Sequence, residues 1–202
     1  MSTSVENMVT PDQTTEKKAS SAIVNVPNAL STIRLIMAFA VGILIELGLF
    51  IPAMITFVVA ASTDFLDGWW ARKFDQVTKL GRILDPFVDK IIITAALIAL
   101  AATQNSGVLP WMVTLIIGRE FLVTSLRAMI EGSGGDFSAR WLGKWKMVFQ
   151  CAAVVASLLL LDQPESTFYY WSTVVLMWAA VLITVASGAD YVVQAMKLSR
   201  AK

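Results

Sequence analysis

The sequence has no histidine, a single cysteine and few charged residues. Without histidine among its 202 residues, the chain cannot build a Ser-His-Asp triad, a phosphohistidine intermediate or a His-ligated zinc site. Cys151 has no second cysteine with which to form a disulfide in the chain, and its apolar sequence neighbours are typical of a small core residue. Any chemistry must therefore rely on carboxylates, cations, hydroxyl groups and hard metal ions.

The chain has few charged residues and many apolar ones. Only 15% of the residues are charged, 56% are hydrophobic and the mean hydropathy is +0.67, whereas a soluble domain has about 25% charged residues. The apolar residues form runs of about twenty with few charges, the length that crosses a hydrocarbon core. The net charge of +1 gives no reason to expect a nucleic-acid partner. These features predict an integral membrane protein.

The apolar runs divide the chain into six predicted helices. Short connections separate them, so we expect an all-α polytopic membrane protein with six transmembrane helices in one bundle. Before them, residues 1–22 are polar and rich in Ser and Thr, which predicts a disordered cytosolic tail, and residues 23–202 form the single domain. The predicted segments are residues 29–49, 52–74, 82–103, 109–130, 141–161 and 168–196.

The distribution of lysine and arginine predicts the orientation in the membrane. The connections at 48–51, 103–108 and 162–167 contain neither residue, whereas basic residues cluster in the tail, at 72–82, at 131–146 and at the C-terminus. Because cytosolic connections carry the excess of positive charge, both termini are predicted to be cytosolic. An even number of spans agrees with that orientation.

Four aspartates stand out in this apolar chain, in the stretch DFLDGWWARKFDQVTKLGRILDPFVDK at 64–90. Residues three or four apart share a face of a helix, so Asp64 pairs with Asp67, and Asp85 pairs with Asp89 on the next helix. Two adjacent antiparallel helices would direct all four carboxylates into one space. The carboxylates cannot all stay ionised there unless cations neutralise them.

Divalent metal ions are the cations that best fit this cluster. Oxygen ligands without Cys or His select Mg²⁺ or Mn²⁺, and four carboxylates can hold two such ions close together. A metal pair of this kind suits phosphoryl transfer, since it offsets negative charge in the transition state. Arg72 offers a fork of donors for phosphate oxygens, and Gly68, Ala71 and Gly81 leave room for a bulky head group. The alternative is that the aspartates cap helices or pair with Lys and Arg at the interface.

The cluster resembles the signature of the CDP-alcohol phosphatidyltransferase family in every position: Asp64-x2-Asp67-Gly68-x2-Ala71-Arg72-x8-Gly81-x3-Asp85-x3-Asp89. The resemblance implies a six-helix membrane enzyme with two divalent metal ions, in which an alcohol displaces CMP from a CDP-linked substrate. By position, Asp64, Asp67 and Asp85 would be the core metal ligands. Asp89 would be the general base and a further metal ligand. The implied cytidine diphosphate pocket consists of Asp64, Gly68, Ala71, Arg72 and Gly81.

Basic residues outside the signature indicate which alcohol is used. Arg119 lies near the middle of the fourth predicted span, where an unpaired cation is costly and usually functional. Because adjacent residues diverge by about 100° on a helix, Arg119 and Glu120 cannot serve one site as a simple face pair, and one of them is expected to pair with another helix. A cationic pocket beside the metal cluster would suit an acceptor that carries its own phosphate, and glycerol 3-phosphate fits. The predicted phosphate ligands are Arg34, Arg119, Arg140, Lys144 and Lys146.

Some of these stretches resemble the bacterial phosphatidylglycerol phosphate synthases, one branch of the family. The opening VNVPNALSTIRL at 24–35 is similar to their N-I-P-N-x-L-T-x-x-R pattern, with Val26 in place of isoleucine. GRE at 118–120 and a later A-x3-G-K-x-K pattern are similar too, although Met147 stands where threonine is common. The resemblance implies CDP-diacylglycerol and glycerol 3-phosphate as substrates, a bacterial cytoplasmic membrane with the active site on the cytosolic side, and a homodimer.

Other functions stay open at this point. A cardiolipin synthase of the CDP-alcohol type would use phosphatidylglycerol, whose phosphate and hydroxyl groups the same cations could bind, and an inositol phosphate acceptor is a further alternative. A small cation or proton transporter would also carry intramembrane carboxylates, but it has little use for glycines and alanine at these intervals. A passive scaffold explains none of the polar clustering. For single residues the alternatives are structural: Arg34 snorkels outward, and Arg127 and Lys146 only follow the positive-inside rule.

Overall fold

The computed structural model describes the backbone of residues 26–74, 79–131 and 141–200, and the side chains of residues 31–63, 90–127 and 145–196. This part of the chain contains no strand and confirms the prediction of an all-α protein. The predicted tail at 1–22 lies outside it. The helices begin and end within a few residues of the predicted bounds, and they are α1 (Val26–Glu46), α2 (Phe50–Phe74), α3 (Lys79–Ala102), α4 (Pro110–Glu131), α5 (Trp141–Asp162) and α6 (Thr167–Arg200).

Local signals in the sequence set several of the helix ends. After α1, Gly48 adopts a φ of 73°, which costs glycine little, and its N–H donates to the Ile45 carbonyl at 3.0 Å. α4 begins with Pro110, whose missing N–H is not needed in the first turn of a helix. Ser166 caps α6, because its Oγ accepts a hydrogen bond from the Tyr169 N–H at 3.4 Å. These signals act over a few residues, which explains why the sequence pattern located the helices well.

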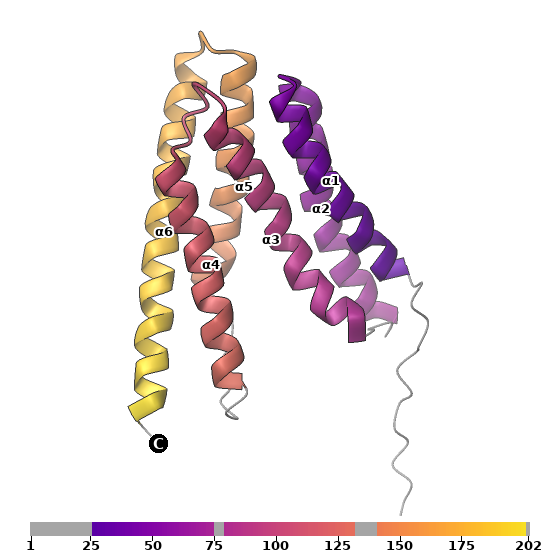
Figure 1. Cartoon of the computed structure of the whole chain (residues 1–202), viewed down its shortest axis with the longest axis vertical. Coiled ribbons are helices and arrows are strands. Elements are labelled where there is room, and N and C mark those ends of the chain that lie inside the picture. The colour runs from indigo at the N-terminus through magenta and orange to yellow at the C-terminus, as the bar shows by residue number, and fades with distance from the viewer. Residues whose placement is uncertain (1–25, 75–78, 132–140, 201–202) are drawn as a thin grey trace, which may run out of the picture.

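The helices form two groups, α1 to α3 and α4 to α6 (Figure 1). α1 packs against α2 and α3, whereas α5 and α4 each pack against α6. The groups are joined by α3, which contacts α4 and α5, and by α2, which contacts α5. α1 begins and α6 ends at the same end of the molecule, where the two groups diverge (Figure 1). We refer to it below as the open end.

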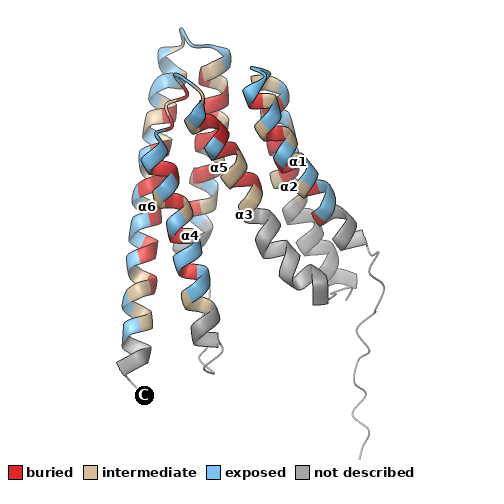
Figure 2. Cartoon of the chain, viewed as in Figure 1, coloured by how far each residue is buried: buried red, intermediate tan, exposed pale blue. Residues whose placement is uncertain are grey.

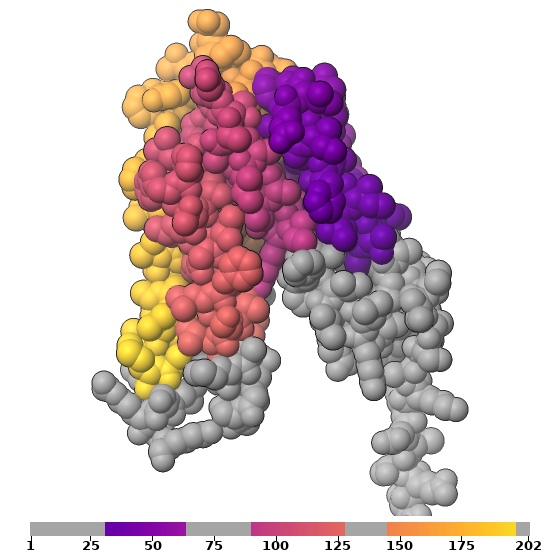
Figure 3. Space-filling model, viewed as in Figure 1, coloured from indigo at the N-terminus to yellow at the C-terminus, as the bar shows by residue number. Residues whose placement is uncertain are grey.

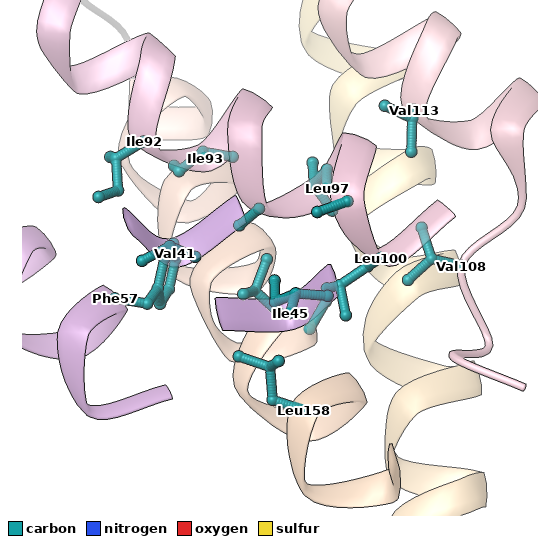
Figure 4. Close-up of a cluster of buried hydrophobic side chains, with 14 of the residues drawn as sticks. Val41, Ile45, Phe57, Ile92, Ile93, Leu97, Leu100, Val108, Val113 and Leu158 are labelled. Carbon is teal, nitrogen blue, oxygen red and sulfur yellow. The ribbon is translucent and has the colours of Figure 1, made fainter. Parts of the chain in front are cut away.

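Among the described residues, the apolar core surrounds α3. Leu97 and Leu100 of α3 are completely buried, and Val41 and Ile45 of α1 pack into the same cluster. Leu158 of α5 closes the cluster from another side (Figure 4). In a membrane, close van der Waals packing of such side chains holds helices together. The core therefore fixes α1, α3 and α5 relative to one another.

Large apolar side chains also cover much of the outer surface (Figure 2). Ile36, Phe39, Phe121 and Leu182 are each more than 60% exposed, at 63%, 63%, 71% and 62%. Such broad apolar exposure marks a surface that contacts lipid or another protein. Among the described residues, Trp145–Asp162 and Thr167–Met196 are long and apolar enough to cross a membrane, and Phe50–Thr63 and Lys90–Ala102 form shorter apolar helices.

The connection between α3 and α4 depends on a glycine. Gly107 has a φ of 74°, and a Cβ added there would lie 2.9 Å from Cγ2 of Thr173 in α6. Gly107→Ala is therefore expected to destabilise the fold by about 1–3 kcal/mol, from backbone strain and the close contact. Thermal unfolding of the detergent-solubilised variant measures the effect. Gly42→Ala is the control, because nothing lies within 4 Å of its added Cβ, and its melting temperature should not fall.

Candidate functional site

The four aspartates of the sequence signature lie on two helices that contact each other. Asp64 and Asp67 belong to α2, Asp85 and Asp89 belong to α3, and α2 packs against α3. The prediction that these residues are helical is confirmed, so the three- and four-residue spacings place each pair on one helix face. Their side chains lie outside the described residues, as do those of Gly68, Ala71, Arg72 and Gly81 in the predicted nucleotide pocket.

The metal site stays a prediction for the same reason. Among the side chains that the structure does describe, no group of three or more Cys, Asp or Glu residues lies together. The chemistry of the donor set is what can be tested: both pairs consist of carboxylates, which are the ligands of hard divalent ions. Two facing helices with two carboxylates each therefore fit the predicted ions.

A buried cationic cluster lies where α4, α5 and α6 meet. Arg119 of α4 is only 8% exposed, and its Nη1 donates to Oε1 of Glu120 at 3.1 Å. Lys146 of α5 is also buried, and its Nζ donates to the same carboxylate oxygen. Among the side chains that the structure describes here, two cations thus share one carboxylate, which leaves an excess of positive charge. Burying charged groups away from water is costly unless a counterion is present, so this cluster suits an anionic ligand.

The prediction that one of Arg119 and Glu120 pairs with another helix is confirmed, because Glu120 contacts Lys146 of α5. The Cα–Cβ directions of Arg119 and Glu120 do diverge on α4, as helix geometry requires. The Arg119 side chain is long enough to reach back to the neighbouring carboxylate, however, and Glu120 in turn reaches Lys146 on α5. The two residues therefore meet although they do not form a face pair on α4.

Lys90 connects the acidic helix with the cationic cluster. It follows Asp89 directly in α3, and its Nζ donates to Oγ1 of Thr124 in α4. The end of α3 that carries the aspartates is therefore held beside α4. The space-filling view is hollowed beside α4, toward the open end (Figure 3).

The structure says less about the other residues predicted to bind the acceptor's phosphate. Arg34 is 1% exposed, so the alternative in which it snorkels outward is wrong. It belongs to α1, which packs against α2 and α3, and its contact with the acceptor stays a prediction. Arg140 lies outside the described residues. Lys144 lies in the first turn of α5, and its side chain is outside them too.

Sequence reasoning missed the partners that α6 supplies. Ser187 accepts a hydrogen bond from Nη2 of Arg119 at 2.7 Å, and the Tyr191 ring lies against the same guanidinium, 5.4 Å from its carbon. Tyr191 also accepts a hydrogen bond from Arg127 at 3.2 Å, so that arginine does more than follow the positive-inside rule. The available signal was the spacing of Ser187 and Tyr191, four residues apart on one face of an apolar helix.

Fold and site together define a helical protein in which a signature of four aspartates lies beside a buried group of cations. A family model described as CDP-alcohol phosphatidyltransferase matches residues 24–186. The chain belongs to the CDP-alcohol phosphatidyltransferase family, and the resemblance seen in the aspartate signature is confirmed. The protein is thus a phosphatidyltransferase by family.

Individual relatives agree with this membership. The CDP-diacylglycerol–glycerol-3-phosphate 3-phosphatidyltransferase of Bacillus subtilis is 42% identical over 137 residues, which cover 68% of this chain and 69% of the relative. A Mycobacterium tuberculosis protein named "Probable phosphatidylglycerophosphate synthase" is 37% identical over 182 residues, or 87% of this chain and 83% of the relative. A Haemophilus influenzae protein with the same name as the first is 30% identical over 173 residues, covering 83% and 91%.

Proposed function

We propose that the protein transfers the phosphatidyl group of CDP-diacylglycerol to sn-glycerol 3-phosphate, forming phosphatidylglycerol phosphate and CMP. The observation that carries this proposal is that α3, which holds half of the aspartate signature, packs against α4 and α5, the helices that carry the buried cations Arg119 and Lys146. A phosphatidyl donor needs the aspartate signature, and an acceptor that carries its own phosphate needs the buried cations. The relatives from B. subtilis and H. influenzae carry names that specify this acceptor.

The donor substrate would bind along the signature on α2 and α3. Asp64, Asp67, Asp85 and Asp89 would hold two divalent cations, Mg²⁺ or Mn²⁺, which supply neutralising charge for the diphosphate and the transition state. Around them, Arg72 would donate hydrogen bonds to phosphate oxygens. Gly68 and Gly81 have no side chain and Ala71 has a short one, so these positions would leave space for the cytidine diphosphate group.

The reaction needs one proton transfer and one displacement. Asp89 would accept the proton of the C1 hydroxyl of glycerol 3-phosphate. That oxygen forms a bond to the lipid-side phosphorus of CDP-diacylglycerol, and the bond from this phosphorus to the bridging oxygen breaks, so CMP leaves with the bridging oxygen. No covalent intermediate on the protein is required, which suits a chain without histidine.

The acceptor's phosphate would bind in the cationic cluster. Arg119 and Lys146 are buried and already close to each other through Glu120. A phosphate monoester carries a charge of about −1.5 to −2 at neutral pH, which balances the excess positive charge. Arg34, Arg140 and Lys144 would complete this pocket.

The membrane arrangement follows from the charge pattern and the apolar exterior. All six helices would cross the bilayer, with residues 23–202 as one domain and both termini in the cytosol. The open end would then face the cytosol, where CMP and glycerol 3-phosphate are soluble. A bacterial cytoplasmic membrane and a homodimer complete the proposal.

The choice of acceptor is the direct test. Purified protein in detergent with CDP-diacylglycerol and Mg²⁺ should release CMP with glycerol 3-phosphate. With glycerol, which lacks the phosphate, kcat/KM should fall about 10²- to 10⁴-fold, since two hydrogen bonds to charged groups contribute roughly 1.5–3 kcal/mol each. The acceptors phosphatidylglycerol and inositol phosphate serve as comparisons.

Other outcomes would redirect the proposal. Efficient turnover with phosphatidylglycerol but not glycerol 3-phosphate would make the protein a cardiolipin synthase of the CDP-alcohol type. Ion flux into liposomes without any lipid substrate, together with no release of CMP, would favour a cation or proton transporter.

A further inference from the structure

Arg119 is held by α6 as well as by its own helix. Nη2 of Arg119 donates to Oγ of Ser187 at 2.7 Å, and the Tyr191 ring covers the guanidinium at 5.4 Å. Between them, Gly188 has no side chain, and a Cβ added there would lie 3.2 Å from Cγ of Arg119. We propose that this α6 cradle (Ser187, Gly188 and Tyr191) positions Arg119 for the acceptor's phosphate and so sets the affinity for that acceptor. The inference rests on the proposed function.

The hydroxyl of Ser187 is itself oriented. Its proton is directed to the Thr184 carbonyl at 3.3 Å, so a lone pair of the oxygen is available to the guanidinium. Thr184 accepts a hydrogen bond from Gln150 at 3.5 Å, which ties this turn of α6 to α5. The cradle is therefore fixed to the helix that carries Lys146.

The aromatic side of the cradle is fixed as well. Tyr191 is only 3% exposed and packs with Val123 of α4. Its hydroxyl group accepts a hydrogen bond from Nη2 of Arg127 at 3.2 Å, so the ring cannot turn away freely. A guanidinium placed on an aromatic face gains cation–π attraction and keeps its edge, with the N–H groups, free for other acceptors.

Arg119 keeps hydrogen-bonding capacity for a ligand. A guanidinium has five N–H groups, and Glu120 and Ser187 accept from two of them. Nε is buried and has no hydrogen-bond partner within the part of the chain that the structure describes. A buried donor without an acceptor is unfavourable, and a phosphate oxygen would supply one. The cradle thus orients the Arg119 side chain and leaves N–H groups available to bind the phosphate of the acceptor substrate.

Two substitutions test the cradle without removing a charge. Ser187→Ala should raise KM for glycerol 3-phosphate about tenfold or more, the effect of losing one hydrogen bond to a charged group. Gly188→Ala should raise the same KM about 3- to 10-fold, because Arg119 must move by a few tenths of an ångström and misplacement of a binding group is costly. KM for CDP-diacylglycerol should stay unchanged in both, and kcat should change less than KM.

Matched variants separate positioning from a general structural effect. Ser187→Thr keeps the hydroxyl and should retain most of the acceptor affinity. Gly118→Ala lies beside Arg119 on α4, but its added Cβ meets nothing within 4 Å, so its kinetics should match the natural chain. Both glycine variants gain helix propensity, so a loss of acceptor affinity in Gly188→Ala alone cannot come from a weaker helix.

The outcomes are distinct from those of the acceptor test. If the unaltered protein releases no CMP with glycerol 3-phosphate, the proposed function fails. If it does, but Ser187→Ala and Gly188→Ala leave the acceptor KM unchanged or alter both substrates equally, the cradle proposal is overturned. Thermal unfolding checks each variant, and if Ser187→Ala does not fold, Gly188→Ala against Gly118→Ala decides the question.

Discussion

EDTA is expected to lower CMP release from CDP-diacylglycerol and glycerol 3-phosphate by at least about 10³-fold. Divalent ions contribute several kcal/mol of charge stabilisation in such a transition state, and roughly 4 kcal/mol corresponds to 10³ in rate. Added Mg²⁺ or Mn²⁺ should restore turnover. The measurement is a CMP-release assay of purified protein against the concentration of each metal ion.

The physical reason lies in the four carboxylates. Asp64 and Asp67 lie on α2, which packs against α3, the helix that carries Asp85 and Asp89. Without cations these groups repel one another and the diphosphate of the substrate. Metal removal should therefore weaken binding of CDP-diacylglycerol as well as turnover.

Two controls make this result specific. Circular dichroism should show that helix content survives EDTA, because most described helices are held by the apolar core around α3. Ca²⁺ is a second control, since it prefers longer bonds and more ligands than Mg²⁺ and should restore little activity. Full activity after complete chelation would contradict the metal site, and the catalytic role of the aspartates with it.

The fold could be predicted from the sequence because its signals are local. Apolar runs marked each helix, and residues such as Gly48 and Pro110 mark their ends with short-range chemistry. The way the helices group around α3 could not be predicted, because the apolar faces of all the helices look alike in sequence. Which face meets which neighbour is decided by packing across the whole molecule.

The candidate site also has residues that could be predicted from the sequence and residues that could not. The aspartate signature was visible because its residues repeat at helical spacing in an otherwise apolar chain. Arg119 was visible because a cation in mid-span is unusual. Its partners Ser187 and Tyr191 were not, since hydroxyl and aromatic groups are common in apolar helices and become partners only when α4 packs against α6.

Asp89→Asn is expected to lower kcat about 10²- to 10⁴-fold, the contribution of general base catalysis. Asparagine has nearly the same shape as aspartate, but it cannot accept the proton of the acceptor's hydroxyl. Binding of CDP-diacylglycerol should be retained if the other three aspartates still hold the metal ions. Steady-state kinetics with both substrates, and direct binding of CDP-diacylglycerol, measure the two effects separately.

Asp162→Asn is the matched control, because this aspartate is exposed at the end of α5, at the opposite end of the molecule from the predicted site. Its kinetics should equal those of the unaltered chain. Comparing the variants at rising Mg²⁺ concentration then separates the two roles assigned to Asp89. A loss of kcat that persists at saturating Mg²⁺ identifies a base, because extra metal cannot replace a proton acceptor. Recovery of kcat with added Mg²⁺ would assign Asp89 to metal binding alone. Near-normal rates of Asp89→Asn without extra Mg²⁺ would remove Asp89 from the mechanism.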